Sequence, residues 1–215
     1  MRNVKHNPKE PRERILEAGA LLFAKKGYAA VSVREIAEAA DVNVAMISYY
    51  FAGKAGVLKE IILRYFDDVQ AIFDKIWSRQ LSSEVALKTF VNELVEVMKN
   101  KTIFCKVAIT EMPFNLPEFS EFKAEVARRH VDYTRQGLQL FKLFVEDERL
   151  NSIIAPAAIS LIFSHFLFLP FIEKVWNVEI NDEYYDLYAK TISTLLFDGL
   201  NGIKSSFQNH TGDVK

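Results

Sequence analysis

The sequence predicts an all-α protein, and two features of its 215 residues support this fold class. Glycine (8) and proline (6) are scarce, which disfavours a β fold with its many turns. Apolar residues recur at steps of three and four along most of the chain, the spacing that places them on one face of a helix. No two segments show the strict alternation expected of paired strands, and the periodic segments predict about nine helices.

The first predicted helix covers residues 12–26 and follows a polar tail, residues 1–11, which we expect to be flexible. Two lysines, Lys25 and Lys26, suit the C-terminus of this helix, and Gly27 ends it. The buried stripe of the helix consists of Ile15, Gly19, Leu22 and Phe23.

Residues 32–51 contain the signals for two short helices joined by a tight turn. Ser32 and Glu35 form the S-x-x-E capping box that begins a helix. Asp41 lies in the turn, where a left-handed backbone is tolerated by aspartate, and Asn43 is a good N-cap for the second helix. This pattern predicts a helix-turn-helix, the motif that places its second helix in the major groove of DNA.

The segments on either side of this motif extend the pattern. Residues 14–28 resemble the first helix, with its closing Gly-Tyr, of the TetR family of bacterial transcriptional regulators. Residues 49–58 resemble the family's Y-H-F-G-S-K-E-x-L junction into a fourth helix. The chain departs from the family at three points: Asp41 replaces the usual turn glycine, Tyr50 the histidine, and Ala52-Gly53 the Gly-Ser. None of these changes removes the predicted DNA-reading surface.

The helix-turn-helix supplies the candidate DNA contacts. Val44 and Ala45 can contact thymine methyl groups, and a helix N-terminus such as that at Ser32 attracts phosphate. The resemblance implies phosphate contacts for Tyr49, Tyr50 and Lys54. The side chain of Met46 fits a core position as well as a base contact, and Arg34 fits a solvated surface as well as DNA. The predicted DNA-binding residues are Ser32, Arg34, Asn43, Val44, Ala45, Met46, Tyr49, Tyr50 and Lys54.

The charge distribution supports this assignment, although the net charge of −1 does not. Residues 1–60 carry ten Lys and Arg and seven Asp and Glu, whereas the remainder carries 17 and 21. A basic N-terminal part on an acidic body is the asymmetry expected when only the first part meets phosphate. We therefore predict a DNA-binding domain at residues 1–53, and an effector-binding and dimerisation domain at residues 54–215.

The second predicted domain is helical throughout. Residues 151–156 are expected to connect two of its helices. The predicted helices cover residues 54–79, 84–100, 101–112, 118–148 and 156–176, and a last helix begins at 181 and ends near Gly199 or Gly202.

Residues 153–172 carry no charged side chain, and their length is that of a membrane span. Pro156 and Pro170 near the ends and His165 in the middle argue against that reading, and we expect burial on several sides instead. In the TetR family the last two helices pair with those of a second subunit, which implies a homodimer. The predicted interface residues, facing either the last helix or the partner, are Ala158, Ile162, Phe166, Leu169, Tyr188, Ile192, Leu195, Leu196 and Gly199.

The resemblance also implies a ligand among the middle helices, and the many phenylalanines of this region suit an apolar effector. Each candidate is also compatible with ordinary core packing. The predicted pocket residues are Phe66, Phe104, Ile109, Met112, Phe141, Phe144 and His165.

No enzyme motif, metal-ligand spacing or phosphate-binding glycine loop occurs in the sequence, so we predict no catalysis and no cofactor. The single cysteine, Cys105, and the lack of a signal-peptide pattern predict a cytoplasmic protein. The predicted function is repression of transcription at a palindromic operator, relieved by a small apolar effector. The alternatives are a DNA-binding regulator without an effector and a helical carrier of small molecules.

Overall fold

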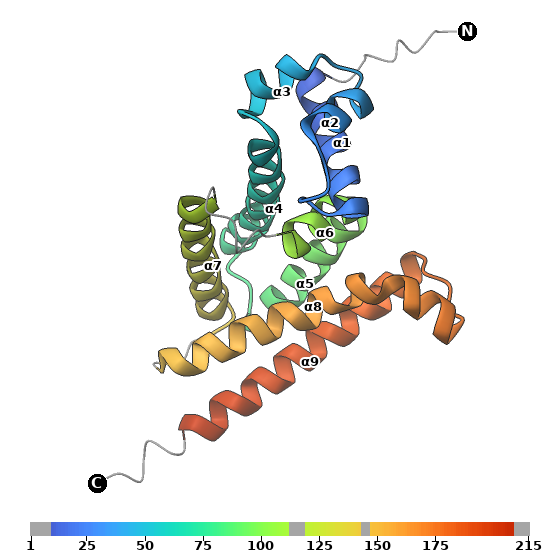
Figure 1. Ribbon diagram of the computed structural model, residues 1–215. Coiled ribbons are helices and arrows are strands. Elements are labelled where there is room, and N and C mark those ends of the chain that lie inside the picture. Colours follow the sequence, from blue (N-terminus) through green and yellow to red (C-terminus); the bar gives the residue numbers. More distant parts are fainter. Residues whose placement is uncertain (1–9, 112–118, 143–146, 209–215) are drawn as a thin grey trace, which may run out of the picture. The chain divides into compact units, whose positions relative to one another are not determined.

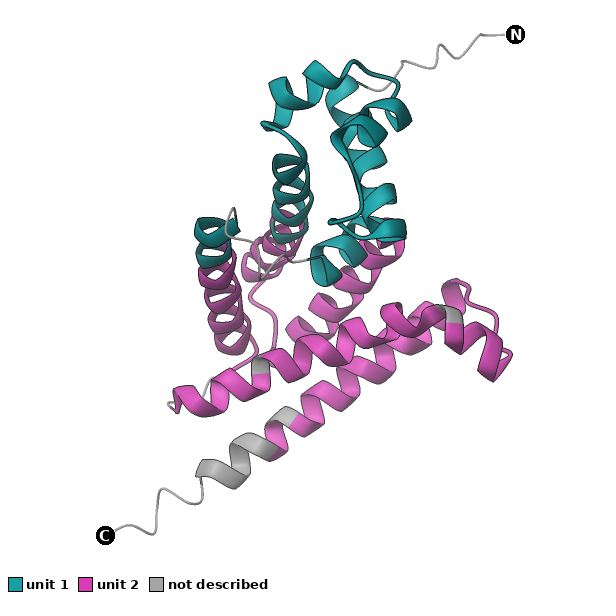
Figure 2. Cartoon of the chain, in the orientation of Figure 1, with its two compact units in different colours: residues 1–66, 103–125 teal, residues 67–102, 126–215 magenta. Residues whose placement is uncertain are grey.

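The computed structural model describes residues 10–111, 119–142 and 147–208. These ranges form nine α-helices and contain no β-strand, which confirms the all-α class (Figure 1). The chain divides into two compact units, the first made of residues 1–66 and 103–125 and the second of residues 67–102 and 126–215 (Figure 2). Most of the predicted tail, residues 1–9, lies outside the described residues.

The first four helices begin and end close to their predicted limits. They are α1 (Pro11–Lys26), α2 (Val33–Ala39), α3 (Val44–Phe51) and α4 (Lys54–Trp77). Gly27 ends α1 with a φ of 78°, a conformation that glycine adopts without steric cost. Helix α4 contributes its first part to the first unit and its second part to the second.

The core of the first unit forms where α1 packs against α2 and α3. Its central side chains are removed from solvent, and each large one contributes about 1.5–3 kcal/mol relative to full exposure. Gly19 allows close packing, since a Cβ there would lie 2.6 Å from Cγ1 of Val57 on α4. The fully buried members of this core include Ile15, Leu16, Phe23, Ile36, Ile47, Leu58, Ile61 and Ile62.

Ion pairs join the first turn of α1 to the first half of α4. Arg64 donates to both carboxylate oxygens of Glu13 at 2.9 Å, and Arg12 donates to Glu60 at 2.6 Å. The hydrogen bond from Arg64 to Glu13 raises the pKa of the arginine. A two-point pair of this kind fixes orientation better than a single contact does, so it sets the angle at which the two helices meet.

The remaining helices form the second unit and part of the first. They are α5 (Ser83–Asn100), α6 (Thr102–Thr110), α7 (Ser120–Leu140), α8 (Glu148–Trp176) and α9 (Asp182–Gln208). Helix α5 packs against α9 and α8, and α8 runs beside α9 (Figure 1).

The predicted break between the helices at 118–148 and 156–176 was misplaced. Helix α7 ends at Leu140, and Lys142 adopts a left-handed φ of 55°. Helix α8 begins at Glu148 because the Asp147 carboxylate accepts from the amide of Arg149 at 2.9 Å. The predicted connection at residues 151–156 is therefore helical, and Pro156 lies inside α8 with its side chain exposed.

Helix α8 contains a stretch, Glu148–Leu169, that is long and apolar enough to cross a membrane by length and composition alone. Only 24% of its most apolar window is buried within the chain. The apolar surface of this helix therefore remains largely uncovered by the chain's own described residues.

Replacement of Gly56 by alanine is expected to destabilise the first unit. A Cβ at this position of α4 would lie 1.5 Å from the carbonyl oxygen of Phe51, a backbone atom that cannot move aside cheaply. Overpacking of this kind costs about 1–3 kcal/mol. Urea denaturation of Gly56→Ala should show a lower midpoint than the wild type.

The matched control is Gly202→Ala on α9, where an added Cβ meets nothing within 4 Å of the chain's own atoms. Alanine is favoured over glycine inside a helix by about 1 kcal/mol, so this variant should be at least as stable as the wild type. Equal stability of the two variants would show that Phe51 and Gly56 are not in close contact.

Candidate nucleic-acid interface

The first turn of α2 carries the predicted capping box. The Ser32 hydroxyl accepts from the amide of Glu35 at 3.2 Å, and the Glu35 carboxylate accepts from the amide of Ser32 at 2.8 Å. Lys26 donates to the same carboxylate at 2.7 Å. The hydrogen bond from Lys26, followed by those from Ser32, lowers the pKa of Glu35 to about 2. The start of α2 is thus fixed by its own residues and by the end of α1.

The turn between α2 and α3 has the geometry that the sequence predicted. Asp41 adopts a φ of 52°, and the Asn43 side-chain oxygen accepts from the amide of Ala45 at 2.8 Å. Besides this capping bond, the side-chain NH₂ of Asn43 could donate to a phosphate oxygen or a base acceptor of DNA. The capping assignment of Asn43 is confirmed, and its contact with DNA stays a prediction.

One face of α3 is exposed and the opposite face is buried. Val44 is 42% exposed and Tyr49 82%, whereas Ile47 is fully buried and Phe51 nearly so. Ala45 and Ser48 are also exposed, so residues 44, 45, 48 and 49 form one continuous stripe along the helix. The sequence prediction missed Ser48, although its spacing of four from Val44 places it on this stripe.

Two predicted contacts on α3 lie between these faces. Met46 and Tyr50 are half-buried, and the Tyr50 ring lies edge-on to Tyr49 with centroids 4.9 Å apart. The partial burial of Met46 is compatible with core packing and with its predicted base contact. Tyr50 supports Tyr49 at the exposed end of the stripe.

Arg34 projects from the first turn of α2 and is exposed. Ser32 is exposed as well, but its hydroxyl is already engaged in the capping box. The exposed stripe of α3 and the start of α2 thus present apolar, hydroxyl and cationic groups together. This combination suits base edges and phosphates.

Lys54 is placed differently from the other predicted contacts. Its ammonium donates to the backbone carbonyls of Tyr28 at 2.9 Å and Val31 at 2.7 Å, and it lies 4.2 Å from the centre of the Tyr28 ring. Two of the three ammonium hydrogens are therefore used inside the first unit. Its predicted contact with phosphate would rest on the third hydrogen and stays a prediction.

The predicted effector-pocket residues fall in both units. Phe66, Phe104 and Ile109 belong to the first unit, and Phe141 and His165 to the second. Met112 and Phe144 lie outside the described residues. Phe66 and Phe141 are buried, whereas Phe104, Ile109 and His165 are half-buried.

Helices α8 and α9 meet through aromatic contacts that involve His165. The imidazole stacks on Tyr188 with centroids 4.2 Å apart, and burial lowers its pKa. Tyr188 donates to the carbonyl of Ile162 at 2.6 Å. Among the described residues, Nε2 of His165 is buried without a hydrogen-bond partner. His165 thus packs inside the second unit, against α9.

The predicted interface residues also divide by exposure. Ile162, Ile192 and Leu196 are buried within the chain itself. Leu195 and Gly199 are exposed, and Ala158, Phe166, Leu169 and Tyr188 are half-buried. Exposed apolar residues that the prediction missed are Leu161, Leu167, Phe168, Phe171, Val175, Trp176 and Leu187.

The part of the chain that the structure describes holds no group of three or more His, Cys, Asp or Glu that could bind a metal ion.

Comparison with known proteins relates these features to a family. The profile described as "Bacterial regulatory proteins, tetR family" matches residues 15–61, which span α1, α2, α3 and the start of α4. The probable HTH-type transcriptional regulator YttP of Bacillus subtilis is 26% identical over 94% of this chain and 96% of its own length. The HTH-type transcriptional repressor KstR of Rhodococcus jostii is 41% identical, but over only 29% of this chain and 30% of its own.

Solved structures share the fold along most of the chain. A TetR-family transcriptional regulator from Bordetella parapertussis aligns with a TM-score of 0.70 and 21% identity, covering 88% of this chain and 95% of its own. A putative fatty acid metabolism regulator from Clostridium perfringens aligns with a TM-score of 0.69 and 20% identity, covering 86% and 97%. These similarities extend the match from the helix-turn-helix to the helical body.

The capping box makes a pH-dependent contribution that can be measured. Because the folded-state pKa of Glu35 is about 2, below the ordinary 4.5, its carboxylate stabilises the fold above pH 4.5. That contribution is lost as the pH falls from 4.5 towards 2. A carboxyl-carbon NMR titration should show Glu35 titrating at about pH 2, well below the ordinary 4.5 of a glutamate side chain. A Glu35 titration near 4.5 would contradict the bonds from Lys26 and Ser32.

Proposed function

Since the chain belongs to the TetR family, and is therefore a DNA-binding transcriptional regulator and not an enzyme, we propose that it represses transcription from a palindromic operator. The observation that carries this proposal is the exposed stripe of α3, residues 44, 45, 48 and 49, together with the exposed Arg34 in the first turn of α2. Stretches of about 65 residues that match KstR, a repressor by name, support the direction of regulation. We also place the protein in the bacterial cytoplasm, where its DNA is found.

The stripe on α3 suits base recognition. Val44 and Ala45 lie at the N-terminal end of the helix, the end that usually contacts base edges in this motif. Ser48 and Tyr49 extend the stripe with hydroxyl groups that can reach phosphate oxygens. Phosphates would thus position the helix, and the residues at its start would supply sequence discrimination.

A palindromic operator requires a two-fold symmetric protein, and α8 and α9 support a homodimer. Phe168 is 58% exposed, Trp176 74% and Leu195 55%. A largely uncovered apolar helix would be unfavourable in water, and a second copy of the same surface would cover it. The polar His165 in the middle of α8 favours a protein partner over lipid.

For the effector we propose a small, mainly apolar molecule bound in the helical body. The interior of the second unit is rich in aromatic rings: Phe90 stacks on Phe73 at 4.7 Å and contacts Phe141 at 5.6 Å. Such an effector would release DNA only if it bound the DNA-free arrangement of the dimer more tightly than the DNA-bound one. A regulator without an effector is the second candidate, and a solid aromatic core would favour it.

The first test is titration of the purified protein against a duplex from the region upstream of its own gene, at two salt concentrations. A scrambled duplex of equal length is the control. We expect saturable binding by a dimer, a clear preference over the scramble and a steep salt dependence. Equal binding to both duplexes would contradict a specific operator in that region.

The role of Arg34 can be read from the salt dependence. Removing one phosphate contact should weaken binding to all sequences alike and reduce the salt slope by about 1. Arg34→Ala is compared with Lys190→Ala, which removes one exposed cation from α9. An Arg34→Ala variant that retained the wild-type affinity and slope would exclude this contact.

The dimer can be tested at its exposed apolar residues. Charges at Phe168 and Leu195 would have to be desolvated at the proposed interface, so the double variant Phe168→Glu/Leu195→Glu should be monomeric. Sedimentation velocity measures the change, with circular dichroism to confirm the helical content. Val85→Glu, at an exposed apolar residue of α5, is the control and should stay dimeric. A double variant that remained dimeric would place the interface elsewhere.

A further inference from the structure

The loop that joins α1 to α2 is held from two sides within the first unit. The backbone amide of Tyr28 donates to the Glu111 carboxylate at 2.7 Å. The carbonyls of Tyr28 and Val31 accept from the Lys54 ammonium. Glu111 directly follows α6, and Lys54 is the first residue of α4. The loop is therefore bonded to two helices that lie far from it in the sequence.

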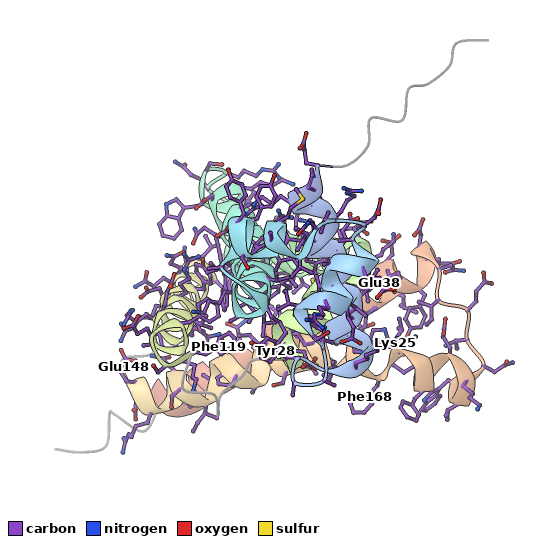
Figure 3. The ribbon with its side chains drawn as sticks, turned by 45° about the horizontal axis from the view of Figure 1, so that its top comes forward. Lys25, Tyr28, Glu38, Phe119, Glu148 and Phe168 are labelled. Carbon is purple, nitrogen blue, oxygen red and sulfur yellow. The ribbon has the colours of Figure 1, made fainter. Side chains whose placement is uncertain are left out.

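The surroundings of Tyr28 explain why its amide needs such an acceptor. Tyr28 is only 7% exposed, and its ring packs against Phe23 with centroids 5.5 Å apart. It also packs against Phe119 with centroids 5.5 Å apart (Figure 3). A partly buried amide without an acceptor would cost free energy, because it has lost its hydrogen bond to water. Glu111 supplies a charged acceptor, and such bonds are stronger than those between neutral groups.

The position of Glu111 is unfavourable for local structure. A negative charge at the C-terminal end of a helix opposes the helix dipole, as Glu111 does at the end of α6. The hydrogen bond to the amide of Tyr28, which lies 83 positions away in the sequence, offsets this cost. The carboxylate is therefore suited to a contact between elements and not to the stability of α6.

The loop leads directly into the DNA-binding residues. Val31 directly precedes Ser32, the N-cap of α2, and Arg34 is the second residue of that helix. We propose that Glu111 is a positioning residue for DNA recognition. Its carboxylate links the end of α6 to the Tyr28 amide, and this bond sets where α2 begins relative to α4. The inference rests on the proposed DNA-binding role of α2 and α3.

Two measurements on Glu111→Ala test the proposal. Amide hydrogen exchange followed by NMR should show faster exchange at Tyr28, because its acceptor is gone. Affinity for the upstream duplex should fall by about tenfold, which corresponds to about 1.4 kcal/mol. The salt slope should stay unchanged, since no phosphate contact is removed. Glu121→Ala, which removes an exposed carboxylate from α7 in the same unit, should behave as the wild type in both measurements.

Glu111→Gln distinguishes the acceptor from the charge. Glutamine keeps a side-chain oxygen of the same reach, so it should restore protection at Tyr28 and most of the affinity, within about threefold of the wild type. It also serves if Glu111→Ala fails to fold. A glutamine variant that protects Tyr28 but still binds DNA tenfold more weakly would overturn the positioning role.

Lys54→Met tests whether both helices act through the same loop. If they do, the double variant Lys54→Met/Glu111→Ala should show a fold-loss of DNA affinity that is smaller than the product of the fold-losses of the two single variants. Losses that multiply would contradict a shared loop.

Three results with Glu111→Ala itself would also overturn the proposal: unchanged exchange at Tyr28, faster exchange with unchanged affinity, or an affinity loss that follows a lowered urea midpoint. If the wild type binds no duplex, the proposed function fails instead. The exchange measurement still shows in that case whether Glu111 holds the loop, so the two failures are distinguishable.

Discussion

The burial of Ile47 and Phe51 against α1 and α2 is the constraint on which the DNA-binding surface depends. A helix turns 100° per residue, so fixing these two side chains inside the core fixes the direction of every other residue on α3. Residues 44, 45, 48 and 49 then face outward together. Specific recognition needs this rigidity, because a rotating helix would present different side chains to the same base pair.

The ends of α2 and α3 are fixed by short polar contacts and not by hydrophobic packing. Ser32 and Glu35 determine where α2 begins, and Asn43 does the same for α3. These short helices bury few side chains of their own, so each cap is a large part of what determines their length. Lys54 and Glu111 also bond to the loop between α1 and α2, and these bonds connect the helix-turn-helix to α4 and to the end of α6.

The second unit follows a different principle. Its helices α5, α8 and α9 bury Val91, Ile162 and Ile192 among themselves, yet leave Phe171, Val175 and Trp176 in solvent. A large apolar surface left in water is unfavourable, and a second copy of the same surface would cover it. The exposed apolar residues of α8 would therefore stabilise the dimer that we propose and not the single subunit.

The sequence by itself determined the local features: the helix-turn-helix, its capping residues, the left-handed Asp41 and the start of α4 at Lys54. Each of these depends on residues within a few positions of one another, where hydrogen-bond geometry and backbone preference suffice. Local signals could not predict that α8 continues through Pro156, because a proline usually indicates the end of a helix. Only the tertiary structure decided the partners of Lys54, Glu111 and His165. These partners lie far away in sequence, and a charged or aromatic side chain carries no local sign of the atom that it will meet once the chain has folded.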